Sequence, residues 1–89
     1  MRFVYFTAII GAGIGGASTA FFLREHFGAD AEISIFERSQ VGGRLATVKM
    51  AGATYEVGGS VIHPANHLMK SLLQKMGISA LPILHVNFV

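Results

Sequence analysis

The feature that most constrains this chain is a glycine-rich stretch at residues 9–16, which reads IIGAGIGG. An apolar run precedes the stretch and an alanine-rich run follows it. Gly11, Gly13 and Gly16 fit the pattern GxGxxG. In this pattern the first glycine permits a tight turn, the second lets the backbone approach a pyrophosphate, and the third lets a helix pack against a strand. Because the free N–H groups of such a helix face an anion, the stretch predicts a dinucleotide-binding turn.

The pattern alone is a weak signal, so the residues around it matter. It requires a strand before, a helix after, and an acidic residue at the end of a second strand about 20 residues on. We predict a strand over residues 2–10, a helix over 13–27 that stops at Gly28, and a strand over 32–37. Together they form a parallel strand–helix–strand unit. Glu37 then ends the second strand and is placed to hold a pair of ribose hydroxyls.

A second glycine cluster follows Glu37. Arg38 resembles a clamp for a 2′-phosphate, but the Glu37 carboxylate would repel that group, which favours a cofactor without it. In the loop over residues 38–45, Gly42 and Gly43 permit close backbone approach, and Arg44 offers a rigid fork of donors suited to phosphate. The alternative is a surface loop with a solvated arginine. Beside a dinucleotide pattern, we favour phosphate contact.

The middle of the chain predicts a hairpin and a return loop. The hairpin has arms over residues 46–50 and 53–57, with Ala51 and Gly52 near its turn. Gly58, Gly59 and Ser60 then bring the chain back towards the cofactor side. The alternative is an ordinary glycine turn.

A second helix is expected to begin with Pro64 in its first turn and to stop at Gly77. Its apolar stripe consists of Leu68, Met69, Leu72, Leu73 and Met76. His63 and His67 have a metal-ligand spacing, but Pro64 separates them and no HExxH pattern is present, so we predict no metal site. The apolar tail over residues 78–89 is either an edge strand or a truncated stub.

Length and composition limit the fold. A chain of 89 residues forms one small domain at most. A complete doubly wound sheet has two halves, and this chain supplies only the first. The prediction is therefore an α/β fold: a partial Rossmann-like FAD/NAD(P)-binding domain over residues 1–89, without a substrate domain. With 52% hydrophobic and 13% charged residues, it should expose apolar surface and dissolve poorly. The sequence contains no cysteine, which excludes disulfides within these residues. The net charge is +2 and the basic residues are scattered along the chain, so we predict no nucleic-acid partner.

The N-terminal third allows a second interpretation. Residues 3–23 lack charge, lie between Arg2 and Arg24, and contain a GxxxG pattern at Gly11 and Gly15. These features are also typical of a membrane anchor or a signal peptide. Interrupting glycines, threonines and a serine weigh against that interpretation, and it does not explain Glu37.

Four strings in this order resemble the N-terminal part of the prenylcysteine oxidases, which are amine-oxidase-like flavoproteins. They are IIGAGIGG at residues 9–16, FER at 36–38, VGGRLAT at 41–47 and YEVGGSVIHP at 55–64. The resemblance covers residues 8–80 and implies FAD as the cofactor. It assigns the pyrophosphate to the glycine turn and the adenosine ribose to the acidic residue at the end of the second strand. It places Gly43 and Arg44 of the GGR loop, residues 42–44, near the phosphates. The segment over residues 58–62 would pass near the flavin. The implied cofactor-binding residues are Gly11, Gly13, Ile14, Gly15, Gly16, Glu37, Arg38, Gly43, Arg44, Gly59, Ser60 and Val61.

The resemblance also implies a reaction: oxidative cleavage of the thioether of farnesyl- or geranylgeranyl-cysteine to cysteine, an aldehyde and hydrogen peroxide. Family members degrade prenylated proteins and are lysosomal or secreted, although no signal peptide precedes the first strand here. Because the substrate domain is absent, we expect an inactive piece whose partner is FAD, with prenylcysteine bound only by a full-length parent. No catalytic residues can be assigned. The alternatives are a non-catalytic truncated product and another FAD- or NAD(P)-dependent oxidoreductase.

Overall fold

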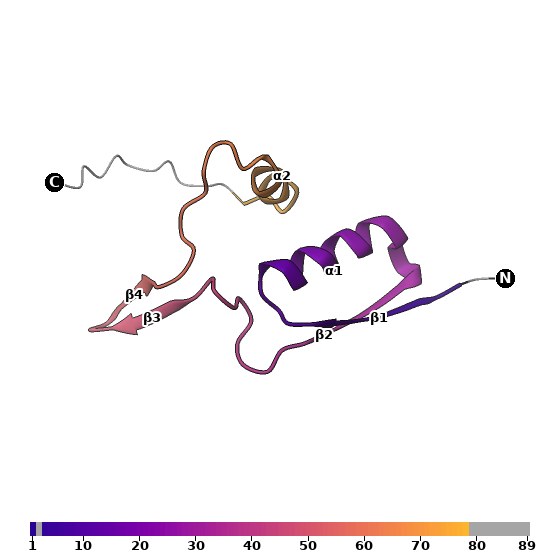
Figure 1. Cartoon of the computed structure of the whole chain (residues 1–89), viewed down its shortest axis with the longest axis horizontal. Coiled ribbons are helices and arrows are strands. Elements are labelled where there is room, and N and C mark those ends of the chain that lie inside the picture. Colours follow the sequence, from indigo (N-terminus) through magenta and orange to yellow (C-terminus); the bar gives the residue numbers. More distant parts are fainter. Residues whose placement is uncertain (2, 79–89) are drawn as a thin grey trace. The chain divides into compact units, whose positions relative to one another are not determined.

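The computed structural model describes residues 1 and 3–78, and the chain divides into two units, Met1–Gly59 and Ser60–Val89. The first unit contains a strand–helix–strand unit followed by a hairpin, and the second contains a single helix in its described part (Figure 1).

The first unit opens with the predicted strand–helix–strand order. β1 (Tyr5–Ile10) and β2 (Ala31–Phe36) are parallel, and α1 (Ile14–Phe27) with the 3-10 turn η1 (Gly28–Asp30) connects them. Figure 1 shows α1 along one side of the two strands. The pairing runs from Tyr5 with Ala31 to Ile10 with Phe36. β1 starts later than the predicted residue 2 because its pairing partner, β2, begins only at Ala31.

Glycine residues mark both ends of α1. Gly13 is the N-cap and Gly28 the C-cap, with φ of +60° at Gly28. The Gly28 N–H donates to the Arg24 carbonyl, and Arg24 Nη1 donates back to the Gly28 carbonyl at 2.8 Å. A glycine at the C-cap satisfies the last free carbonyls without the steric cost of a side chain, and Gly28 thus ends the helix as predicted.

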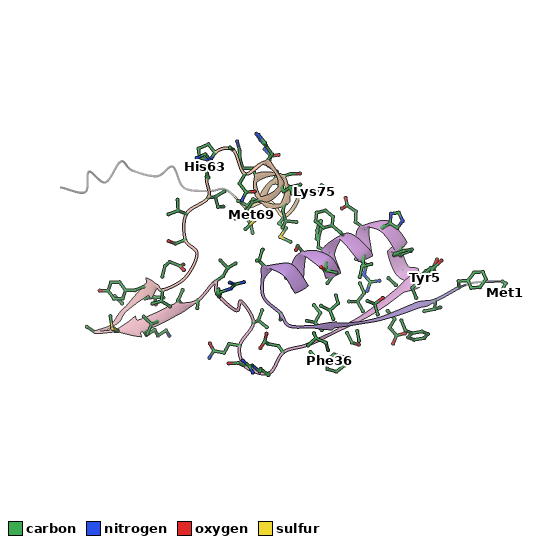
Figure 2. The ribbon with its side chains drawn as sticks, in the orientation of Figure 1. Met1, Tyr5, Phe36, His63, Met69 and Lys75 are labelled. Atoms are coloured by element: carbon green, nitrogen blue, oxygen red, sulfur yellow. The ribbon has the colours of Figure 1, made fainter. Side chains whose placement is uncertain are left out.

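The core of the first unit lies between the sheet and α1. Ile9 and Ala31 are buried, whereas Phe6, Ile10 and Phe36 are 77%, 83% and 58% exposed. Figure 2 shows Phe36 on the side of the strands away from α1. Parallel sheets are normally covered on both faces, and in the described part of the first unit α1 covers one face. The predicted exposure of apolar surface is therefore confirmed.

The hairpin consists of β3 (Thr47–Met50) and β4 (Ala53–Glu56), which pair antiparallel. Ala51 and Gly52 form its turn with φ of +49° and +78°. Two successive residues with positive φ are typical of the type I′ turn, whose twist matches that of paired strands. The Val57 N–H donates to the Ala46 carbonyl at 2.9 Å and continues the ladder, so the predicted arms are confirmed to within one residue.

The second unit contains α2 (His67–Lys75), which starts later than predicted. Asn66 is the N-cap, and its side-chain oxygen accepts a hydrogen bond from the Met69 N–H at 3.1 Å. The prediction that Pro64 lies in the first turn of this helix is wrong. Asparagine is among the strongest N-caps, and Asn66 fixes the start of the helix at His67, three residues after the proline.

The apolar stripe of α2 is only partly buried. Leu72 is the buried residue of the helix, while Leu68 is 85% exposed and Met76 is 46% exposed. Gly77 follows the helix with φ of +69°, as the predicted stop requires. The tail prediction for residues 78–89 falls, from residue 79 onward, outside the described residues.

No helix in the described part of the chain is long and apolar enough to cross a membrane. Residues 3–23, the candidate anchor, are divided among β1, the glycine turn and α1.

Candidate functional site

The glycine turn, residues 11–16, joins β1 to α1 at the carboxyl end of the sheet. Gly11 has φ of +98°, a conformation that residues with a Cβ rarely adopt. Its N–H donates to the Phe36 carbonyl at 2.7 Å, which extends the contact between β1 and the end of β2. Gly11 therefore supplies the tight turn predicted for the first glycine, and its N–H is engaged by the sheet.

Gly16 provides the close packing predicted for the third glycine. A Cβ built on Gly16 would meet the Gly11 carbonyl oxygen and would lie 3.3 Å from Cγ2 of Ile9. The first turn of α1 thus rests directly on the end of β1, with no room for a side chain at Gly16.

The start of α1 leaves hydrogen-bond donors unused. No side chain caps this helix and no acidic residue lies in its first turn. The N–H groups of Gly13, Gly15 and Gly16 form no hydrogen bond with another described residue. A Cβ built on Gly15 would meet nothing within 4 Å. Open space, free N–H groups and the positive end of the helix dipole together fit a phosphate group.

Glu37 follows β2 directly and turns back to the glycine turn. Its Oε1 accepts a hydrogen bond from the Ala12 N–H at 3.0 Å, and its Oε2 accepts one from the Ser39 N–H at 2.8 Å. These bonds, with the Ala12 bond contributing most, hold the pKa of the Glu37 carboxyl below its ordinary value of 4.5. Backbone donors therefore hold this group as a carboxylate, an acceptor-only group of the kind that suits ribose hydroxyls.

The GGR loop, residues 42–44, packs against the glycine turn through its backbone. The Gly42 N–H donates to the Ala12 carbonyl at 2.8 Å, and Gly13 and Gly42 form an isolated parallel bridge. A Cβ built on Gly43, whose φ is +59°, would lie 3.3 Å from the Gly13 Cα. Gly42 and Gly43 therefore contact the glycine turn, although Gly43 remains exposed. The Arg44 side chain is exposed, and its phosphate contact stays a prediction.

The return loop contacts the GGR loop in turn. The Gly59 N–H donates to the Arg44 carbonyl at 3.1 Å, and a Cβ built on Gly58 would meet the same oxygen. The structure thus brings together backbone from the glycine turn, the GGR loop and residues 58–59. Ser60 and Val61 are exposed and belong to the second unit, so their role near the flavin stays a prediction, as does that of the exposed Arg38.

The two histidines with metal-ligand spacing do not share a helix. His63 precedes α2 and its Nδ1 accepts a hydrogen bond from the Ala65 N–H at 3.0 Å, while His67 is the first residue of the helix. Among residues 1 and 3–78, no three His, Cys, Asp or Glu side chains gather as a metal site would require.

Sequence reasoning missed the part played by Ala12 and Ser39. Both act through backbone N–H groups, which carry no side-chain signal. The available hint was the position of Ala12 between two glycines of the turn.

Comparison with known proteins points to one family. Residues 9–76 match the family model described as an NAD(P)-binding Rossmann-like domain. Prenylcysteine oxidase 1 from mouse (Mus musculus) is 57% identical over 75 residues, which is 84% of this chain and 15% of the relative. The human (Homo sapiens) protein is 59% identical over 73 residues, 82% of this chain and 14% of the relative. Farnesylcysteine lyase from Arabidopsis thaliana is 43% identical over 76 residues, covering 80% and 15%.

Solved structures agree with this match. Wild-type putrescine oxidase bound to putrescine superposes with a TM-score of 0.70 at 38% identity, covering 85% of this chain and 16% of that one. A double mutant of the same enzyme, made in a redesign of cofactor binding, gives a TM-score of 0.71 at 38% identity, covering 82% and 16%. The chain therefore spans between 14% and 16% of the length of these proteins.

The predicted cofactor and family agree with these relatives. The glycine turn and the fixed Glu37 carboxylate fit a dinucleotide, and the oxidase relatives support FAD as that dinucleotide. The chain belongs to the NAD(P)-binding Rossmann-like domain family and is homologous, over about four fifths of its length, to the prenylcysteine oxidases.

Proposed function

We propose that this chain forms the part of an FAD site that holds the pyrophosphate and the adenosine ribose, in a flavoprotein oxidoreductase of the prenylcysteine oxidase type. The observation that carries this proposal is the meeting of two features at one point. The start of α1 has unused N–H groups, and the Glu37 carboxylate accepts a hydrogen bond at 3.0 Å from Ala12 in the glycine turn that leads into this helix.

Each feature suits one portion of the ligand. The N–H groups of Gly13, Gly15 and Gly16 would donate to the pyrophosphate oxygens, since backbone donors at a helix start stabilise negative charge. The Glu37 carboxylate is acceptor-only and would accept hydrogen bonds from the ribose hydroxyls. Gly42 and Gly43 pack on Gly13, whereas a Cβ built on Gly15 would meet nothing within 4 Å.

For the whole protein we propose the reaction implied by the names of its relatives, prenylcysteine oxidase and farnesylcysteine lyase. Farnesyl- or geranylgeranyl-cysteine, water and oxygen would give cysteine, the prenyl aldehyde and hydrogen peroxide. The bound FAD supplies an acceptor for the hydride that leaves the isoprenoid carbon. Since the chain spans about 15% of these relatives, we propose that it does not turn over prenylcysteine by itself. A lysosomal or secreted location, and a role in degrading prenylated proteins, belong to the same proposal.

FAD retention tests the cofactor part of this proposal. The purified chain is incubated with FAD and desalted, and the visible absorbance of retained flavin is recorded. Parallel samples contain FAD with excess NAD⁺ or NADP⁺ as competitor. We expect retained flavin that neither nicotinamide cofactor displaces. Displacement by NAD⁺ would favour a nicotinamide-dependent oxidoreductase instead, and absence of retained flavin would contradict FAD binding by this chain.

Peroxide production tests the reaction. The FAD-treated chain is mixed with farnesylcysteine, and hydrogen peroxide is measured against a sample without substrate. We expect no peroxide above that control. Peroxide formed in proportion to the amount of chain would overturn the proposal that the chain is inactive alone.

A further inference from the structure

Ala12 is the residue at which three separate segments of the first unit meet. It is 7% exposed, and both of its backbone polar groups have distant partners. Its N–H donates to Glu37 Oε1 at 3.0 Å, and its carbonyl accepts from the Gly42 N–H at 2.8 Å. The glycine turn, the end of β2 and the GGR loop are thus joined through one residue whose side chain is a methyl group.

Glu37 supplies the carboxylate of this junction. Its second oxygen accepts from the Ser39 N–H at 2.8 Å, so the carboxylate also shapes the start of the loop that leads to Gly42. The pKa of Glu37 is lowered by backbone N–H groups of Ala12, Ser39 and Arg38, and no charged side chain contributes. The neighbouring Arg38 acts here through its backbone. The carboxylate is therefore held by the fold rather than by an ion pair.

Building on the function proposed above, we propose that Glu37 is a positioning residue that assembles the glycine turn before any cofactor binds. A carboxylate offers about four lone-pair sites, and Ala12 and Ser39 occupy two of them. The remaining two can accept ribose hydroxyls without releasing Ala12. Glu37 therefore orients the turn in the free chain and keeps that orientation when the ligand arrives.

Replacing Glu37 by glutamine tests whether both oxygens of the carboxylate are needed as acceptors. A carboxylate accepts at both oxygens, whereas a glutamine side chain accepts at its oxygen and donates from its NH₂ group. In Glu37→Gln the NH₂ group must face either the Ala12 or the Ser39 N–H, and donor then opposes donor. Only one of the two bonds survives. Glu37→Ala removes both, and Glu32→Gln, an exposed site on β2, is the matched control.

Amide exchange in the cofactor-free, ¹⁵N-labelled chain tests the positioning role. We expect the Ala12 N–H to exchange about tenfold faster or more in Glu37→Ala, the factor that loss of a hydrogen bond to a charged group predicts. The Gly11 N–H, bonded to the Phe36 carbonyl at 2.7 Å, is the internal control and should keep its rate. In Glu32→Gln both rates should match the unaltered chain. Equal Ala12 exchange in Glu37→Ala and the unaltered chain would overturn the proposal.

A pH titration of the unaltered chain gives a second readout that needs no variant to fold. The amide shifts of Ala12 and Ser39 should both follow the Glu37 carboxyl carbon, with one shared midpoint below 4.5. An Ala12 shift that ignores the Glu37 titration would overturn the proposal. Neither experiment contains FAD, so both results stand whether or not the chain retains flavin. Loss of flavin retention alone would count only against the proposed function.

Discussion

Gly16 lies so close to Gly11 that a Cβ on Gly16 would meet the Gly11 carbonyl oxygen, whereas the neighbouring Gly15 faces open space. Two glycines of the same helical turn therefore serve different purposes. Gly16 permits the close packing of α1 on β1, and Gly15 leaves open space next to the free N–H groups.

The first prediction follows from this difference. Gly16→Ala should destabilise the first unit by about 1–3 kcal/mol, as overpacking does, because the clashing atom belongs to rigid backbone. Gly15→Ala should keep or raise the free energy of unfolding by up to about 1 kcal/mol, since alanine favours a helix. Gly15→Ala should nevertheless lose FAD retention, because its methyl group fills the space next to the free N–H groups. Thermal unfolding and flavin retention after desalting measure the two effects. Equal stability of the two variants would contradict the packing argument.

The second prediction concerns acid. The folded chain holds the pKa of Glu37 below 4.5, so the carboxylate stabilises the fold fully above that pH. Its contribution is lost as the pH falls through the lowered value. Glu37→Gln lacks this titration. The difference in thermal midpoint between the unaltered chain and Glu37→Gln should therefore be constant above pH 4.5 and shrink below it. A difference that persists unchanged in strong acid would show that charge is not its source.

The third prediction concerns the hairpin turn. Ala51 adopts φ of +49°, which costs an alanine roughly 1–2 kcal/mol but is tolerated by asparagine. Ala51→Asn creates the Asn–Gly pair that type I′ turns favour, so it should stabilise the hairpin by about 1 kcal/mol. Gly52→Ala, at φ of +78°, should weaken it. Amide exchange of the Val57 N–H, which closes the ladder onto Ala46, reports both effects. Slower exchange in Gly52→Ala than in Ala51→Asn would refute this turn assignment.

The fourth prediction concerns solubility. Ile9 and Ile10 are adjacent but lie on opposite faces of β1, at 9% and 83% exposure. Ile10→Thr should raise the soluble, monomeric fraction and change stability by no more than about 0.5 kcal/mol. Ile9→Thr should cost about 1–3 kcal/mol, because it buries a hydroxyl beside Gly16. Size-exclusion chromatography and thermal unfolding check the pair. Unchanged association in Ile10→Thr would show that the exposed face of β1 does not drive self-association.

The order of elements could be predicted from the sequence because each signal is local. Gly28 marks the end of α1, and Ala51 and Gly52 mark the hairpin turn, within a few residues of the elements they punctuate. The first residue of β1 could not be predicted in this way, because it depends on where its pairing partner β2 begins. The start of α2 was misplaced because two start signals, Pro64 and Asn66, lie close together, and the stronger N-cap prevails.

The sequence indicates which residues form the candidate site, but it does not reveal the contacts between them. The glycine pattern and Glu37 indicate a dinucleotide through residue type and spacing alone. The bond between Glu37 and Ala12 depends on the register in which Ile10 pairs with Phe36, because that pairing brings the residues just beyond both strands together. Every residue type except proline carries the same backbone amide, so residue type does not reveal which amide the carboxylate binds.

The contacts of Gly16 with Gly11 and of Gly58 with Arg44 are made by backbone against backbone. These backbone contacts limit which substitutions the chain tolerates at the glycine positions. In a hydrophobic core, a substitution that removes a methyl group can be compensated by a larger side chain at a neighbouring position. Such positions can therefore change in pairs during evolution. Here no neighbour can compensate, because even alanine, the most conservative replacement, adds an atom where none fits. In a saturation mutagenesis experiment these positions should accept one residue each, while the exposed apolar positions around them accept many.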